Sequence, residues 1–313
     1  MRWNVLLSAP YMVPFADRFV PELQAAGCRV TVAPVEERLE ETDLLRLMPE
    51  MDGIICGDDR LTRRVIEALP RLKVISKWGT GIDSIDQQAC ADRGVRLCNT
   101  PNAFTTPVAD STLAYVLAFA RRSFEMDRAM HAGEWRKIPG RALHECTLGI
   151  IGVGNIGCAV ARRARAFGMR VLGCDLRSLS PGTLSEFGIE QVDLNVLLEQ
   201  SDFVTLHCDL NPTSRHLLGR EAFGMMKPQA IVLNLARGPC VDESALVEAL
   251  QAGRIGGAAL DVFEVEPLPI RSPLRGMPNV LLAPHNSNSS ATAWERVHRS
   301  TIDQLLAALR LSP

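Results

Sequence analysis

The fold is decided by Leu148-Gly149-Ile150-Ile151-Gly152-Val153-Gly154-Asn155-Ile156-Gly157. Its first four residues suit a buried strand, and a helical pattern follows Gly157. A G-x-G-x-x-G motif between a strand and a helix is typical of a dinucleotide site, where the glycines allow a tight turn, close approach to the pyrophosphate and close helix–strand packing. We therefore predict that the following residues bind a dinucleotide cofactor: Gly152, Gly154, Asn155, Ile156 and Gly157.

An acidic residue stands where such a site needs one. The next apolar run, 170–174, ends directly before Asp175. In dinucleotide sites of this kind an acid roughly 20 residues past the motif binds the ribose hydroxyls, and Asp175 lies close to that position. A carboxylate there repels the 2′-phosphate of NADP, so NAD is the predicted cofactor. Arg177, two residues further on, leaves NADP open as the alternative.

Short apolar runs alternate with helical patterns on both sides of this motif, which predicts parallel sheets built from βαβ units. Between the two series of runs, Thr105–Arg122 is predicted as one long connecting helix, and an amphipathic helix to Leu309 returns the chain to the first domain. We expect two α/β domains, 1–99 plus 287–313 and 100–286. The expected strands are 4–8, 29–33, 53–55, 74–76 and 95–98, then 147–151, 170–174, 203–207, 230–234, 258–262 and 280–283.

Composition excludes several classes of protein. The 313 residues include 34 Lys and Arg against 36 Asp and Glu, and 47% are hydrophobic, which excludes a disordered chain and a basic nucleic-acid binder. No apolar run approaches the roughly 20 residues that span a bilayer. Nine cysteines without a C-x-x-C pair favour reduced thiols in the cytoplasm, with no metal site. The expected partner is a small molecule.

Three downstream segments add chemistry to cofactor binding: Asn234-Leu235-Ala236-Arg237-Gly238, Asp261-Val262-Phe263-Glu264-Val265-Glu266-Pro267 and Ala283-Pro284-His285. Together with the glycine motif and Gly79-Thr80-Gly81-Ile82-Asp83, they resemble the D-isomer-specific 2-hydroxyacid dehydrogenase family. That resemblance implies two doubly wound parallel-sheet domains, a flavodoxin-like substrate domain built from both chain ends and a Rossmann NAD-binding domain inserted between them. It also implies interconversion of a D-2-hydroxy acid and its 2-oxo acid.

The same resemblance assigns the site residues. It makes Arg237, Glu266 and His285 catalytic, puts Asp261 near the nicotinamide carboxamide, and docks the substrate carboxylate on Gly79, Thr80 and Gly81. It further implies a homodimer formed through the region of the connecting helix and the segment around Trp135.

Physical chemistry agrees with the catalytic trio. Hydride transfer at a C2 carbon needs a group that exchanges the hydroxyl proton and a cation that orients the carboxylate. His285 suits the first task and Arg237, with its two-pronged guanidinium, the second. Glu266 beside the imidazole would stabilise its protonated form. All three follow expected strands, whose carboxyl ends bind ligands in open α/β sheets.

Departures from the family pattern limit the choice of substrate. Phosphoglycerate-oxidising members carry an arginine after the third strand that holds the substrate phosphate, whereas this chain has Cys56–Asp59 there. Asp58 or Asp59 would repel a phosphate, unless Arg60 turns inward and binds it. Asn286 and Ser287 make the surroundings of His285 more polar than the family pattern does. We also expect no regulatory domain after Pro313. The competing interpretations are an NAD-sensing protein of the corepressor type and a relative acting on phosphite.

Overall fold

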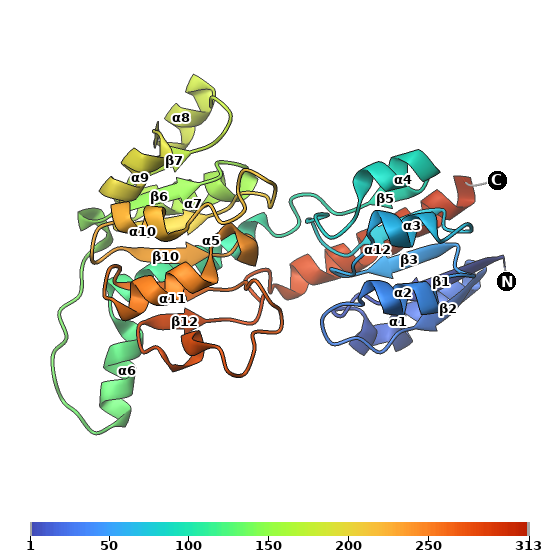
Figure 1. Ribbon diagram of the computed structural model, residues 1–313, viewed down its shortest axis with the longest axis horizontal. Helices are drawn as coiled ribbons and strands as arrows, with labels where there is room; N and C mark the ends of the chain where they lie inside the picture. Colours follow the sequence, from blue (N-terminus) through green and yellow to red (C-terminus); the bar gives the residue numbers. More distant parts are fainter. Residues whose placement is uncertain (1, 312–313) are drawn as a thin grey trace. The chain divides into compact units, whose positions relative to one another are not determined.

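The computed structural model describes residues 2–311, which form two compact units (Figure 1). One unit consists of the residues up to Phe104 together with those from Ser290 onward, and the other is Thr105–Ser289. Each unit has its own parallel sheet with helices packed on it. The predicted fold class, two doubly wound α/β domains, is confirmed.

The first unit contains a five-stranded sheet with the order β2-β1-β3-β4-β5, in which every pair of neighbours is parallel. This is the flavodoxin-like strand order. Strands β3 and β4 are buried throughout, as expected of the apolar runs that form the middle of a parallel sheet. The strands are β1 (Trp3–Leu7), β2 (Cys28–Val32), β3 (Gly53–Cys56), β4 (Val74–Lys77) and β5 (Arg96–Cys98).

The last helix of the chain belongs to the first unit, where it packs on β3, β4 and β5 (Figure 1, red). Two buried hydrogen bonds fix it to the sheet: the Ser76 hydroxyl donates to the carbonyl of Thr301 at 2.8 Å, and the Trp78 indole donates to Nδ1 of His298 at 2.9 Å. The helices of this unit are η1 (Val13–Phe15), α1 (Ala16–Ala25), α2 (Glu41–Leu47), α3 (Arg63–Glu67), α4 (Gln87–Arg93) and α12 (Ala291–Leu311).

The second unit contains a seven-stranded parallel sheet with the order β12-β11-β10-β9-β6-β7-β8. Strand order reverses between β6 and β9, as in a Rossmann sheet, with one extra strand at the β12 edge. All six strands expected in this region are present, and β8 is an addition that its short, largely polar sequence did not signal. The strands are β6 (Thr147–Ile151), β7 (Arg170–Cys174), β8 (Ile189–Gln191), β9 (Phe203–Leu206), β10 (Ile231–Asn234), β11 (Gly257–Leu260) and β12 (Val280–Leu282).

The predicted connecting helix, Thr105–Arg122, is present as α5, which begins at Thr105 and ends at Ala120. Arg122 then adopts a left-handed φ of 53° and precedes a second helix, α6, which the sequence analysis did not predict. Helix α5 packs on α7, while α10 packs on both α9 and α11. The helices of this unit are α5 (Thr105–Ala120), α6 (Ser123–His131), η2 (Leu143–Glu145), α7 (Asn155–Ala166), α8 (Pro181–Phe187), α9 (Leu194–Gln200), α10 (Arg220–Met225), η3 (Gly238–Cys240), α11 (Glu243–Gln251) and η4 (Pro273–Gly276).

Within residues 2–311, none of the helices combines the length and the apolar character that crossing a membrane requires.

Candidate active site

Three of the predicted site residues follow three neighbouring strands of the second unit. Arg237 comes shortly after β10, Asp261 directly after β11 and His285 shortly after β12. These strands lie side by side and parallel, so their carboxyl ends form one edge of the sheet. Such an edge is where open α/β sheets bind ligands.

His285 and Glu266 form a pair. Nδ1 of His285 lies 3.0 Å from Oε2 of Glu266, and both side chains are largely buried. The other carboxylate oxygen of Glu266 accepts a hydrogen bond from the backbone N–H of Phe263 at 2.9 Å, which fixes the carboxylate. An acceptor at Nδ1 orients the imidazole and holds a proton on that nitrogen. Nε2 is therefore the ring nitrogen suited to exchanging a proton with a substrate.

Asp261 holds the backbone around His285. Its carbonyl accepts from the N–H of His285 at 2.8 Å, and its buried carboxylate accepts from the N–H groups of Asn286 and Ser287 at 2.8 and 2.9 Å. His285 has a left-handed φ of 51°, a conformation that costs a non-glycine residue energy and needs support from its surroundings. Asp261 supplies that support. Its contact with a nicotinamide carboxamide stays a prediction.

Arg237 lies on a turn held from two sides. Its carbonyl accepts from the side chain of Asn234 at 3.0 Å and from the N–H of Cys240 at 3.1 Å. The next residue, Gly238, packs so closely against the backbone of Phe263 that no side chain fits there. Phe263 is the residue whose N–H holds Glu266. The arginine turn and the loop that bears Glu266 are therefore in direct backbone contact.

The glycine-rich turn fits a dinucleotide. Gly152 has φ +90°, and a Cβ atom there would lie 2.6 Å from the backbone nitrogen of Cys208. Gly157 packs directly on the carbonyl of Gly152, whereas a Cβ at Gly154 would meet nothing within 4 Å. Two glycines therefore allow tight packing, and the third leaves the N-terminus of α7 open to the close approach that a pyrophosphate needs. Asn155 and Ile156 form the first turn of that helix.

Asp175 follows β7 at the side of this turn. Its carboxylate accepts from the backbone N–H of Val153 at 2.8 Å and from the N–H and Nε of Arg177 at 3.0 and 2.9 Å. The bond with the Arg177 guanidinium lowers the pKa of Asp175 to about 2, so the carboxylate is ionised across the physiological range. The charges of Asp175 and Arg177 already compensate each other. Arg177 is the residue because of which the sequence left NADP open as the alternative cofactor.

The loop Gly79–Gly81 lies in the first unit, directly after β4. The carbonyl of Gly79 accepts from the N–H of Thr100 at 2.8 Å, and the hydroxyl of Thr80 donates to the carbonyl of Thr100 at 3.0 Å. Gly79 has φ +110°, which explains why glycine stands there. These bonds hold the loop in place.

Sequence reasoning gave Lys77 no role, yet its ammonium group lies beside this loop. A Cβ atom at Gly79 would lie 3.8 Å from Nζ of Lys77. The ammonium donates to the carbonyl of Trp78 at 2.9 Å and pairs with Asp58 at 3.1 Å. A lysine at the end of a short strand that begins with Val74 and Ile75 was the signal that could have identified it.

The two acids after β3 differ from each other, which corrects the expectation that either of them faces a substrate. Asp59 is fully buried, accepts a hydrogen bond from the Ser8 hydroxyl at 2.5 Å and another from the N–H of Leu39 at 2.5 Å. Burial raises its pKa to about 6. Asp59 therefore ties together three segments of the first unit, and Asp58, paired with Lys77, is the acid that remains partly exposed.

His207, the residue after the last strand position of β9, has a structural partner. Its Nε2 lies 2.9 Å from the hydroxyl of Thr205, and burial lowers the pKa of the imidazole to about 3, which keeps it neutral. His207 directly precedes Cys208, whose backbone packs against Gly152. It supports the loop beside the glycine-rich turn.

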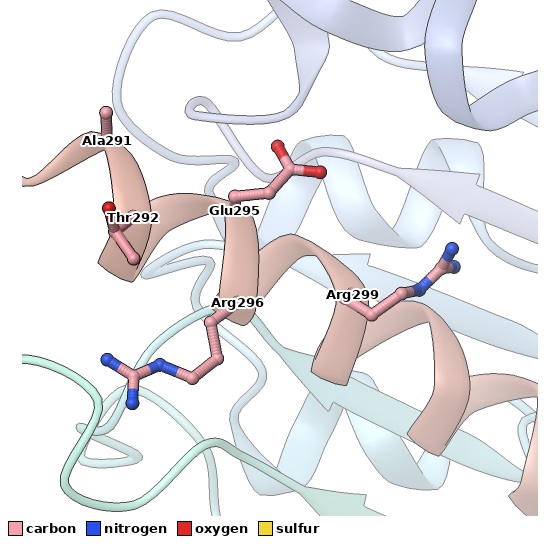
Figure 2. A pocket seen from close by; sticks show the side chains of 5 residues that line it. All are labelled: Ala291, Thr292, Glu295, Arg296 and Arg299. Atoms are coloured by element: carbon pink, nitrogen blue, oxygen red, sulfur yellow. The ribbon is translucent and has the colours of Figure 1, made fainter.

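A shallow hollow lies on α12 of the first unit (Figure 2). Two of its charged side chains form ion pairs: Glu295 with Arg18 at 2.9 Å and Arg299 with Glu22 at 2.7 Å. The residues that line it, none of which belongs to the predicted site, are Ala291, Thr292, Glu295, Arg296 and Arg299.

Comparisons with known proteins agree with this geometry. The family described as D-isomer specific 2-hydroxyacid dehydrogenase, NAD binding domain, matches residues 113–287. A hydroxypyruvate reductase of Thermotoga maritima is 38% identical over 278 residues, which cover 87% of this chain and 90% of that protein. A D-3-phosphoglycerate dehydrogenase of Methanocaldococcus jannaschii is 40% identical over 277 residues, but the match covers 87% of this chain and only about half, 52%, of that protein.

A solved structure of a D-2-hydroxyacid dehydrogenase is also similar to this chain. The D-lactate dehydrogenase of Aquifex aeolicus, crystallised with NAD and lactic acid, superimposes with a TM-score of 0.85 at 27% identity, over 98% of this chain and 95% of that one. The family match covers more than half of the chain, and the hydroxypyruvate reductase and the D-3-phosphoglycerate dehydrogenase are 38% and 40% identical to it. The chain therefore belongs to the D-isomer specific 2-hydroxyacid dehydrogenase family, NAD-dependent oxidoreductases that interconvert 2-hydroxy and 2-oxo acids.

Proposed function

We propose that this protein interconverts small, unphosphorylated D-2-hydroxy acids and their 2-oxo acids, with glyoxylate and hydroxypyruvate as the oxo acids it reduces best and NADH as the reductant. The observation that carries the proposal is the His285–Glu266 pair at 3.0 Å, on the same sheet edge as Arg237 and Asp261. The relative named hydroxypyruvate reductase supports the choice of substrate. The nine free thiols support a reducing compartment, the cytoplasm.

Each residue has a task that its surroundings suit. NAD, when bound on the glycine-rich turn, supplies or accepts the hydride. Arg237 is suited to binding the substrate carboxylate through paired hydrogen bonds. In the first unit, the N–H groups of the Gly79–Gly81 loop are likewise suited to binding a carboxylate. His285 donates its Nε2 proton to the C2 oxygen as the carbonyl is reduced, and takes it back in oxidation. Glu266 stabilises the protonated imidazole and keeps its orientation.

A turnover assay tests this function. The purified protein is mixed with NADH or NADPH and one of glyoxylate, hydroxypyruvate or pyruvate, or with phosphite and the oxidised cofactor, and absorbance of the reduced cofactor is followed. We expect NADH consumption with the first two. Turnover of phosphite alone, or cofactor binding without turnover of any of these compounds, would contradict the proposal and favour the phosphite-oxidising or the NAD-sensing alternative.

Cofactor preference is predicted to depend on Asp175. Asp175→Ser removes the carboxylate that repels a 2′-phosphate and releases Arg177, so the ratio of kcat/KM with NADPH to that with NADH should rise by about 10–100-fold. Steady-state kinetics with both cofactors measure this ratio. Glu186→Gln, which removes an exposed negative charge paired with Arg162, is the control and should leave the ratio unchanged. A wild-type protein that prefers NADPH would overturn the assignment.

Substrate choice is predicted to exclude a phosphate. Because Asp58 already compensates the charge of Lys77, the ammonium group beside the Gly79 loop is poorly suited to binding a dianion. We expect kcat/KM for hydroxypyruvate to exceed that for 3-phosphohydroxypyruvate by about tenfold or more, since an unpaired charge is costly to desolvate. The two compounds are compared side by side. A tenfold preference for the phosphorylated compound would show that Lys77 or Arg60 binds the phosphate.

The active form is proposed to be a homodimer that uses α6 and the segment after it. Phe124, Met130 and Trp135 are exposed there, Trp135 to 86%, an apolar surface that association with a second copy would cover. Trp135→Asp should therefore yield a monomer in light scattering at micromolar concentration. Ile270→Asp, which alters a similarly exposed apolar residue outside α6, should stay dimeric. A wild-type monomer, or a dimeric Trp135→Asp variant, would contradict this interface.

A further inference from the structure

A lysine and an aspartate form an ion pair at the carboxyl edge of the first unit's sheet. Lys77 is the last residue of β4, and Asp58 lies two residues after the end of β3. These strands are parallel neighbours with Cys56 opposite Lys77. Nζ of Lys77 lies 3.1 Å from Oδ1 of Asp58. The ion pair therefore lies at strand ends of the kind where open α/β sheets bind ligands.

The two members of the ion pair differ in exposure. The side chain of Lys77 is 6% exposed and that of Asp58 is 34% exposed, so a ligand reaches the pair from the side of Asp58. Holding the loop after β3 in place is already the task of the next residue, Asp59, which bonds to Ser8 and to the backbone of Leu39. Asp58 therefore has a different task, and compensating the charge of the buried ammonium is one part of it.

The hydrogen-bonding groups of the ion pair suit a hydroxyl group. An ammonium has three N–H donors; that of Lys77 donates to the carbonyl of Trp78 at 2.9 Å and pairs with Asp58, which leaves one donor for a ligand. A carboxylate has about four lone-pair sites, so Asp58 can accept a further hydrogen bond. A donor and an acceptor thus lie side by side without net charge. A hydroxyl, which both donates and accepts, satisfies both groups, whereas a phosphate needs excess positive charge and a methyl group satisfies neither.

We propose that Lys77 and Asp58 bind the hydroxyl group of a 3-hydroxylated 2-oxo acid such as hydroxypyruvate. Lys77 donates to the hydroxyl oxygen, and the hydroxyl donates to Asp58. Nζ of Lys77 lies 3.8 Å from the position of a Cβ atom on Gly79, in the loop whose N–H groups suit a carboxylate. The hydroxyl of hydroxypyruvate is on the carbon next to the carbonyl, close to the carboxylate. This inference rests on the proposed function and names the two residues that select among its substrates.

Pyruvate is the matched substrate for the test, because it differs from hydroxypyruvate only in lacking the hydroxyl. We expect kcat/KM of the wild type to be about 10–100-fold higher for hydroxypyruvate, since pyruvate leaves the polar groups of the site without a partner. Lys77→Met keeps the length of the side chain and removes the donor, so this ratio should fall by about tenfold. Lys227→Met, which removes a lysine paired with Asp202 at 3.2 Å, is the control and should keep the wild-type ratio.

A second variant should gain a preference, a result that mere loss of folding does not produce. Asp58→Asn keeps the size of the side chain and releases the charge of Lys77, so kcat/KM for 3-phosphohydroxypyruvate relative to hydroxypyruvate should rise by about tenfold or more. Wild-type ratios in both variants, or equal use of pyruvate and hydroxypyruvate by the wild type, would overturn this inference and leave the proposed function standing. Turnover of none of these 2-oxo acids, nor of glyoxylate, would overturn both.

Discussion

His285→Asn is expected to lower kcat by about 10²–10⁴-fold, the usual effect of losing a positioned acid–base group. The side chain is uncharged and of similar size, so the loop held by Asp261 keeps its three backbone hydrogen bonds. The Kd for NADH, measured by fluorescence titration, should change by less than about threefold, because the loss falls on proton transfer and not on cofactor binding.

The control for this prediction is His144→Gln, which alters an exposed histidine of the same unit and should leave kcat unchanged. Steady-state kinetics with hydroxypyruvate compare the two variants. If His285→Asn keeps more than about a tenth of the wild-type kcat, His285 is not the acid–base group.

Arg237→Lys is expected to lower kcat/KM for the 2-oxo acid by about 10²–10³-fold. A lysine keeps the positive charge but loses the planar pair of donors that holds a carboxylate in one orientation. Because the turn around Arg237 is fixed by backbone contacts through its carbonyl and through Gly238, the substitution leaves the fold intact. The loss should be measured as kcat/KM, with the Kd for NADH as the second readout.

Arg254→Lys provides the matched control, since Arg254 is an exposed arginine of the same unit. Its kinetics should match the wild type. Near-normal kcat/KM in the Arg237→Lys variant would show that the role given to Arg237 is wrong.

The parts of the fold that could be predicted are those that depend on local pattern. Apolar runs predicted the strands because a parallel sheet buries both faces of each strand. The strand, glycine turn and helix at 148–157 predicted a cofactor site, because each glycine has a backbone reason to be there. β8 escaped notice because it is three residues long and mostly polar at an edge of the sheet.

Features that depend on distant partners could not be predicted. The sequence treats Asp58 and Asp59 as equivalent neighbours, yet Ser8 and Leu39, some 20 to 50 positions away, decide that Asp59 is buried. In the same way, helix α6 was not predicted, because it begins after a left-handed Arg122, and arginine has no preference for that conformation.

The candidate site shows the same division. Placing Arg237, Glu266 and His285 after expected strands was enough to predict that they share one sheet edge. The pairing of His285 with Glu266 was predicted from the resemblance and the chemistry of the two side chains, and the loop after β11, which packs on Gly238, positions Glu266 for it. The backbone role of Asp261 was not predicted, because it depends on hydrogen bonds to residues some 25 positions later, for which there is no local signal.

The most direct test of the proposed reaction is the chirality of its product. The protein is incubated with NADH and hydroxypyruvate, and the glycerate formed is separated on a chiral column while NADH absorbance is recorded. We predict D-glycerate, one molecule for each NADH consumed, and none with His285→Asn on the same time scale. Formation of L-glycerate, or no consumption of NADH, would contradict the assignment of this chain's active site.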